Sequence, residues 1–291
     1  MNESIMKLED LNFEYPDGTH ALKGINMEFK RGEFIALLGS NGAGKSTLFH
    51  HLNGIMRPST GRVLFEDKPV DYSRKGIMAL RQAVGMVFQD PDNQLFSASV
   101  YQDVSFGAVN LRLPEDEVRR RVEIAIERTG IAHLRHKPTH SLSFGQKKRA
   151  AIAGVLVMEP QVLALDEPTA GLDPKGVTEI MQLLKETQKE LGLTVIISTH
   201  DIDIVPLHCN RVSVMAEGRN ILEGTPQEVF SQSQILRSAN LRLPRIGHLM
   251  EILKEKDGFA IDEIPMTVAG ARKALKKIYN PSGTGGDSIR N

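Results

Sequence analysis

The chain has 291 residues, of which 41% are hydrophobic and 25% charged, a composition typical of a soluble protein with one large or two small domains. Its 36 Lys and Arg residues equal its 36 Asp and Glu residues, which argues against a protein whose main task is to coat nucleic acid or an anionic membrane. A single cysteine, Cys209, excludes an intramolecular disulfide, and the lack of a secretory signal or of about 18 consecutive apolar residues predicts a cytoplasmic protein.

The first 90 residues carry strand patterns interrupted by one helix. Polar and apolar residues alternate over 6–15 and 25–29, which predicts two half-buried strands. The continuous apolar run Phe34–Leu38 suits a central parallel strand, and it leads through a glycine-rich loop into a helix expected at 45–53. Residues 84–88 read as another strand.

Residues 90–158 have helical periodicity, with one helix ending before Gly130 and another expected from Ser143 to Met158. Strand patterns return at 162–165 and 194–197, separated by an amphipathic helix that opens at Asp173-Pro174. This alternation of strands and helices predicts an α/β protein with a mostly parallel sheet covered on both faces.

The region after Gly224 changes character again. Thr225–Glu228 reads as a capping box that opens a short helix, and helical stretches follow at 246–254 and 268–278. Residues 281–291 have nothing to bury, so we expect a disordered tail there.

A phosphate-binding loop lies between the strand at Phe34–Leu38 and the helix after it. Its glycines allow backbone N–H groups to converge on phosphate oxygens at the positive end of that helix. Lys45 is expected to reach the β- and γ-phosphates, and the hydroxyl of Ser46 is expected to bind Mg²⁺. The residues expected to bind nucleotide here are Gly39, Ser40, Asn41, Gly42, Ala43, Gly44, Lys45, Ser46 and Thr47.

An acidic pair, Asp166 and Glu167, follows the apolar strand at 162–165. A carboxylate at the end of a buried strand can hold Mg²⁺ and its water ligands, which is the role expected of Asp166. Glu167 is then placed to orient or deprotonate an attacking water. Helix capping alone is the alternative for an isolated pair of this kind, but the phosphate-binding loop favours the catalytic interpretation.

The segment Leu142–Gln146 resembles the signature motif of ATP-binding cassette (ABC) ATPases, with Phe144 as its one departure. The resemblance implies an α/β P-loop NTPase fold of the ABC-ATPase type, with a RecA-like core, an antiparallel β subdomain and an α-helical signature subdomain. It implies ATP and Mg²⁺ as ligands, with two ATP molecules held between two cassettes. The turn residues Ser143, Gly145 and Gln146 would face the nucleotide held by the other subunit.

The other motif positions of the family are present as well. Gln89 matches the glutamine that reaches Mg²⁺ and water, and His200 matches the histidine that contacts the γ-phosphate. Asp173, in the segment 170–173, matches the residue that crosses the dimer interface. Tyr15 matches the aromatic residue that stacks on adenine, although a tyrosine at a strand end can also be a core residue. The catalytic residues implied are Glu167, His200 and Gln89, with Ser46, Gln89 and Asp166 at the metal.

The same resemblance divides the chain into three parts. Residues 1–235 would form the nucleotide-binding domain, with its helical subdomain at about 90–158. Residues 236–280 would form a small C-terminal helical extension that adds dimer contacts, and residues 281–291 the tail.

Two further segments restrict the resemblance to one group within the family. Gln89–Phe96, with Asp103–Gly107 after it, is similar to the ATPases of energy-coupling factor (ECF) importers, and Asn240–Arg245 resembles the cobalt-transport ATPases of that group. The implied partners are a CbiQ-like transmembrane coupling subunit, a substrate-binding membrane component and a second ATPase subunit, which is expected to be an identical copy. The protein would then act at the cytoplasmic face of the cell membrane.

Other functions stay open at this stage. An ECF ATPase for vitamins or nickel is one alternative, and an ABC ATPase acting on nucleic acid or ribosomes is another. The second is disfavoured because the sequence has a single phosphate-binding loop and no long coiled-coil insertion before the signature segment. The basic run Lys147–Arg149 could contact phosphate or lipid, but a solvated helix face is the simpler expectation. His133, His136 and His140 are expected to be exposed, and Cys209 inert and partly buried.

Overall fold

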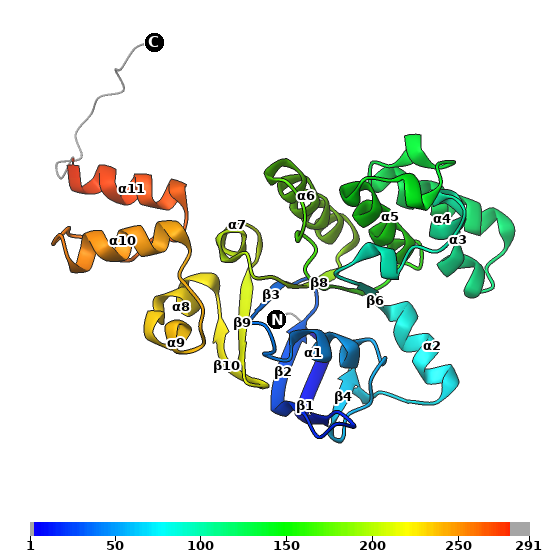
Figure 1. Ribbon diagram of the computed structural model, residues 1–291, viewed down its shortest axis with the longest axis horizontal. Coiled ribbons are helices and arrows are strands. Elements are labelled where there is room, and N and C mark those ends of the chain that lie inside the picture. Colours follow the sequence, from blue (N-terminus) through cyan, green and yellow to red (C-terminus); the bar gives the residue numbers. More distant parts are fainter. Residues whose placement is uncertain (1–2, 280–291) are drawn as a thin grey trace, which may run out of the picture.

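The computed structural model describes residues 3–279 and contains two β-sheets with helices packed around them (Figure 1). The larger sheet has the strand order β10-β9-β3-β8-β7-β6, in which all neighbouring pairs are parallel except β9 and β10. Its strands are β3 (Phe34–Leu38), β6 (Val84–Val87), β7 (Val162–Leu165), β8 (Thr194–Ser198), β9 (Arg211–Ala216) and β10 (Arg219–Gly224). The predicted parallel sheet is confirmed, and the hairpin β9–β10 extends it.

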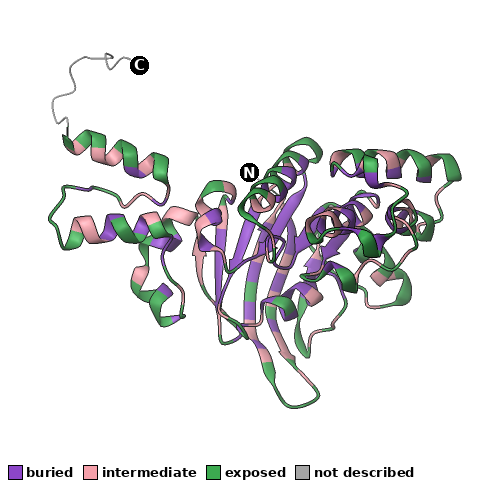
Figure 2. Ribbon diagram, turned by 45° about the horizontal axis from the view of Figure 1, so that its top comes forward, coloured by how far each residue is buried: buried purple, intermediate pink, exposed green. Residues whose placement is uncertain are grey.

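The central strands are buried on both faces, which explains their continuous apolar sequences (Figure 2). In β3, Phe34 and Leu38 belong to the same hydrophobic cluster as residues of α5 (Phe144–Leu156) and α6 (Pro174–Leu191). Ile35 and Leu37 point the other way and join a cluster with α1 (Lys45–Leu52) and the second sheet. Successive residues of one strand therefore hold two layers together.

The second sheet is antiparallel, with the order β2-β1-β4-β5. Its strands are β1 (Ser4–Glu14), β2 (His20–Lys30), β4 (Thr60–Phe65) and β5 (Lys68–Pro69). The second strand begins at His20, earlier than the sequence pattern indicated. The alternation gives no signal for β4, because its first three residues are all exposed.

The helical subdomain lies at the opposite side of the molecule from the C-terminal helices (Figure 1). Its helices α3 (Val100–Asn110), α4 (Glu115–Arg128) and α5 share one hydrophobic cluster, and α2 (Arg74–Ala83) leads from the small sheet into β6. Helix α4 ends just before Gly130, as predicted, and α5 begins with a capping box between Ser143 and Gln146.

The C-terminal part is helical. Its elements are α8 (Pro226–Ser231), α9 (Ser233–Ser238), α10 (Arg245–Glu255) and α11 (Val268–Tyr279), whereas the short α7 (Val205–His208) precedes β9 in the chain. The capping box of Thr225 and Glu228 at α8 is confirmed, and α10 and α11 share a small cluster around Met250, Ile261 and Ala271. The domain boundary at residue 235 stays a prediction, and the predicted tail at 281–291 lies outside the described residues. Among the described helices, none is long and apolar enough to cross a membrane.

Candidate functional site

The phosphate-binding loop connects β3 to α1. Gly44 is the N-cap residue of α1 with φ of +100°, and a Cβ atom there would lie 2.7 Å from the carbonyl oxygen of Ala21. Only glycine fits that position without strain. The Nζ atom of Lys45 donates hydrogen bonds to the carbonyl oxygens of Gly39 (2.7 Å) and Ser40 (3.1 Å). Burial lowers the pKa of Lys45, although the Glu167 and Asp166 carboxylates oppose that shift.

One cavity of about 810 Å³ brings most of the predicted site together. Its lining includes the predicted residues Tyr15, Asn41, Gly42, Ala43, Gly44, Lys45, Ser46, Thr47, Gln89, Asp166, Glu167 and His200. These residues come from the segment after β1, from the loop and α1, and from the segments after β6, β7 and β8. The carboxyl ends of parallel strands meet at one edge of a sheet, which explains why residues distant in sequence line one cavity.

Tyr15 is fixed at the wall of this cavity by its neighbours. Its hydroxyl lies 2.9 Å from Oγ1 of Thr47, the third residue of α1, and its ring meets Phe13 edge-on at 5.0 Å. Phe13 in turn contacts the ring of His51 at 4.7 Å. The tyrosine ring is therefore held at the start of α1 while one side of it borders the cavity.

The acidic pair is held by the last residue of β8 and by a residue just after that strand. Oε2 of Glu167 lies 2.8 Å from Nδ1 of His200, and the Glu167 N–H donates to Oγ of Ser198 at 2.9 Å. The same Ser198 hydroxyl donates to Oδ1 of Asp166 at 2.5 Å. Glu167 adopts a left-handed backbone with φ of +48°, which is costly for a residue with a side chain. Sequence reasoning missed Ser198, whose signal was a hydroxyl at the end of the apolar strand β8.

Lys148 corrects a prediction. A solvated helix face was expected for Lys147–Arg149, but Lys148 is fully buried. Its Nζ atom donates to the carbonyl oxygens of Gln89 (2.6 Å) and Glu167 (3.0 Å). Burial lowers the pKa of Lys148 to about 8, although nearby carboxylates, led by that of Glu167, oppose that shift. The helical period places position 148 on the inner face of α5, together with Ile152. The run of three charged residues in the sequence hid this placement.

The signature turn lies elsewhere on the chain. Ser143, Gly145, Gln146 and Asp173 line a second hollow of about 410 Å³, and no residue lines both this hollow and the nucleotide cavity. Ser143 and Asp173 are the N-cap residues of α5 and α6. Within one chain, the structure therefore does not bring these four predicted residues to the phosphate-binding loop.

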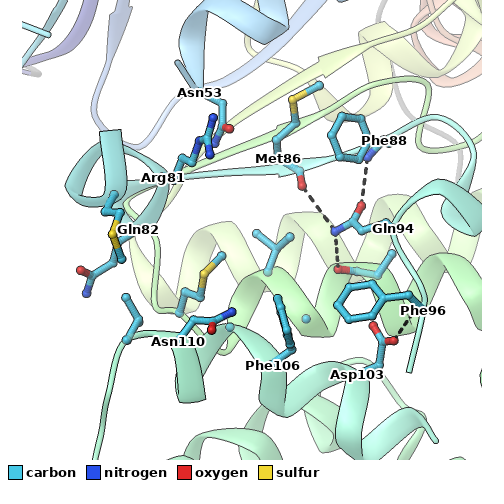
Figure 3. Close-up of a pocket in the computed structure, with 17 residues that line it drawn as sticks. Asn53, Arg81, Gln82, Met86, Phe88, Gln94, Phe96, Asp103, Phe106 and Asn110 are labelled. Carbon is cyan, nitrogen blue, oxygen red and sulfur yellow. Dashed lines mark hydrogen bonds between the residues drawn. The ribbon is translucent and has the colours of Figure 1, made fainter. Parts of the chain in front are cut away.

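A third hollow, of about 450 Å³, lies between α2, β6, α3 and α5 (Figure 3). The rings of Phe96 and Phe106 meet edge-on at 4.7 Å along it, and both are exposed. Phe88 lines this groove, whereas its chain neighbour Gln89 lines the nucleotide cavity. The side chain of Gln94 accepts a hydrogen bond from the Phe88 N–H at 3.2 Å, which ties the groove to the same strand end.

Three histidines and the single cysteine lie away from the nucleotide cavity. His133, His136 and His140 are exposed, and the described residues contain no group of three His, Cys, Asp or Glu side chains suited to a metal ion. Cys209 is buried more completely than predicted, and burial raises the pKa of its thiol to about 12.

The fold and the site together define an ABC-type ATP-binding cassette, with its phosphate-binding loop, signature turn and acidic pair in the chain order that is typical of this class. Residues 22–170 match the family described as ABC transporter. The energy-coupling factor transporter ATP-binding protein EcfA2 of Clostridium perfringens is 69% identical over 284 residues, which cover 96% of this chain and all of that protein. The chain therefore belongs to the ABC transporter family and, within it, to the ECF transporter ATP-binding proteins, which are ATPases.

Solved structures agree with this assignment. The structure of cbiO1 from Clostridium perfringens, described as part of the ABC transporter complex cbiONQ, matches with a TM-score of 0.75 and 72% identity over 86% of this chain and all of that one. The cassette MJ0796, in a dimeric post-hydrolysis state with ADP and Pi, matches with a TM-score of 0.70 and 28% identity over 76% of this chain and 99% of that one.

Proposed function

We propose that this chain hydrolyses ATP as one half of a homodimer that energises an ECF-type importer. The separation of its two phosphate-facing surfaces carries this proposal. The cavity with Lys45 and His200 and the hollow with Ser143 and Gly145 share no lining residue. Two chains arranged head to tail would bring the cavity of each onto the hollow of the other, so that two ATP molecules lie between them.

The donor set in the nucleotide cavity fits Mg²⁺. Ser46, Gln89 and Asp166 offer a hydroxyl, an amide oxygen and a carboxylate oxygen, the hard oxygen ligands that this ion prefers. The hydroxyl of Ser198 donates to one oxygen of Asp166 and orients that carboxylate. Bound together with the β- and γ-phosphates, Mg²⁺ would neutralise charge that develops during phosphoryl transfer.

The catalytic roles follow from the network around Glu167. Its Oε2 atom is held by Nδ1 of His200, so the carboxylate is positioned to accept a proton from an attacking water. Lys45, now bonded to the loop carbonyls, would turn to the phosphates when ATP binds. His200, whose side chain is 70% exposed, is free to contact the γ-phosphate at the interface.

The γ-phosphate would be the switch for opening and closing. Only in the closed dimer would it be bound from both sides, by Lys45 and His200 of one chain and by Ser143 and Gly145 of the other. Its release after hydrolysis removes the contacts that distinguish the closed from the open state, so the dimer opens. This cycle converts hydrolysis into a movement that a membrane partner can use.

The groove in Figure 3 is the proposed docking surface for a partner in the membrane. Exposed Phe96 and Phe106 offer an apolar surface for a helix of the transmembrane coupling subunit. Through the neighbours Phe88 and Gln89, a helix seated there would act on the nucleotide cavity. The chain would then work at the cytoplasmic face of the cell membrane, beside a substrate-binding membrane component.

Cobalt ions are the proposed cargo, on the resemblance of Asn240–Arg245 and on the similarity to cbiO1. Nickel and vitamins are the alternatives within the same transporter class. The three cargoes can be distinguished by measuring the uptake of radioactive cobalt, nickel and a vitamin by cells that contain this chain together with the membrane subunits of its transporter. Cobalt uptake that requires an intact Glu167 supports the proposal, and vitamin uptake alone contradicts it.

Light scattering of the Glu167→Gln variant tests the homodimer. With Mg·ATP and no other protein, this variant should shift from monomer to dimer because it binds ATP without splitting it. Glu186→Gln, an exposed change on α6, is the matched control and should stay monomeric during turnover. A Glu167→Gln sample that binds ATP and remains monomeric at all concentrations would contradict the proposal.

A further inference from the structure

Lys148 is a buried cation held by main-chain carbonyls. Its side chain is fully buried, and no carboxylate in residues 3–279 forms an ion pair with it. Its Nζ atom instead donates to the carbonyl oxygens of Gln89 at 2.6 Å and Glu167 at 3.0 Å. A buried ammonium is expensive unless its donors are satisfied, so the position of both carbonyls matters to the stability of this arrangement.

The two carbonyls belong to the segments that carry the proposed catalytic side chains. Gln89 lies two residues beyond the end of β6, and Glu167 lies two residues beyond the end of β7. Glu167 has a left-handed backbone, which must be held by its surroundings. Ser198 accepts its N–H, and Lys148 binds its carbonyl oxygen on the other side. The strained residue is thus fixed at both of its peptide groups.

Phe144 joins this arrangement to the signature turn. It is the first residue of α5, and Nζ of Lys148, one turn later, lies 5.5 Å from the centre of its ring. The ring also abuts Gly171, where a Cβ atom would lie 2.9 Å from Cε1 of the phenyl group. Phe144, although 38% exposed, therefore lies between Lys148 and the loop that leads to Asp173, which gives a physical reason for its place in the signature segment.

We propose that Lys148 is a positioning residue that couples the two nucleotide sites of the dimer. This inference rests on the proposed function. The N-cap residue of α5, Ser143, would face the nucleotide of the partner, and one turn further along the helix Lys148 holds the carbonyls of Gln89 and Glu167 in its own site. A displacement of α5 on ATP binding at one site is passed through Lys148 to the catalytic segments of the other. Phe144 keeps the ammonium in place.

Substitutions at Lys148 test this coupling in the full-length protein. Lys148→Met keeps an unbranched side chain that is only one atom shorter and removes its donors, whereas Lys148→Arg retains donors. Lys147→Met is the control, because Lys147 pairs with the exposed Asp92 and, unlike Lys148, does not bind the carbonyl oxygens of Gln89 and Glu167. The measurements are kcat, KM and the Hill coefficient of ATP hydrolysis, the affinity for ATP, and the thermal midpoint.

We expect Lys148→Met to lower kcat by about 10- to 100-fold and to bring the Hill coefficient to 1, with ATP affinity changed less than about threefold. Lys148→Arg should restore part of kcat, and Phe144→Leu should lower cooperativity without unfolding the chain. A Lys148→Met protein with wild-type kcat and cooperativity would overturn the inference. A parallel loss of ATP affinity, thermal midpoint and kcat in both Lys148→Met and Phe144→Leu would also overturn it, since it marks a purely structural role. If wild-type and Glu167→Gln chains never dimerise with ATP, the proposed function fails instead.

Discussion

Ser198 offers the sharpest test of how the acidic pair is held. Its hydroxyl accepts the Glu167 N–H at 2.9 Å and donates to Oδ1 of Asp166 at 2.5 Å, and all three residues are buried. Ser198→Ala leaves a buried N–H without a partner and removes a hydrogen bond to a carboxylate. The two losses together should lower the free energy of unfolding by about 2–4 kcal/mol. Because Glu167 then loses one of the bonds that hold its strained backbone, kcat should fall about tenfold.

Thr194 provides the matched control at the other end of β8. Its buried hydroxyl accepts the Gly32 N–H at 3.1 Å and donates to the carbonyl oxygen of Lys30 at 3.2 Å, far from the nucleotide cavity. Thr194→Val should cost stability of similar size, about 1–3 kcal/mol, and leave kcat unchanged. Urea denaturation and steady-state phosphate release measure the two quantities. Equal losses of stability with wild-type kcat in both variants would refute the positioning role of Ser198.

Three more outcomes follow from the same structure. Glu167→Gln should lower kcat by about 10²–10⁴-fold with ATP affinity retained, measured by single-turnover phosphate release, whereas a rate within threefold of wild type would remove Glu167 as the general base. Because burial raises the pKa of Cys209 to about 12, iodoacetamide should label it only as the protein unfolds, and rapid labelling in the native state would contradict that burial. Burial lowers the pKa of His51, whose Nδ1–H donates to the Thr47 carbonyl at 2.7 Å, so the fold favours the neutral ring. The stability that this residue contributes is complete above the pKa of the unfolded state and is lost as the pH falls below it, with a slope of at most about 1.4 kcal/mol per pH unit. His51→Gln should therefore make the urea midpoint depend less on pH between about pH 7.5 and 5.5. An unchanged slope in that variant would exclude His51 as its source.

The nucleotide cavity could be predicted from sequence because its residues lie in short motifs at the ends of strongly apolar strands. Lys45 follows a glycine-rich turn after β3, and Glu167 follows β7, so each motif carries its own structural context. Parallel pairing then brings these strand ends to one edge. The end of α4 and the start of α6 could be predicted as well, because Gly130 follows the first helix and Asp173 precedes the second.

The supporting residues could not be found in the same way. The role of Ser198 depends on β8 lying next to β7, and that of Lys148 on which side of α5 faces the two catalytic segments. Neither relation is local in sequence. The strands β4 and β10 have mixed burial patterns without a strong period, so tertiary pairing rather than local pattern determines them.

The central claim is that each ATP site is completed by a second chain, and mixing two inactive variants tests it most directly. Lys45→Ala disables the phosphate-binding loop, and Ser143→Arg blocks the signature turn, so each homodimer should be inactive. A mixed dimer contains one site with both defects and one intact site. We predict that an equimolar mixture recovers about one quarter of the wild-type ATPase rate, because about half of the dimers are mixed and each has one working site. A mixture no more active than the two variants alone would contradict the shared site.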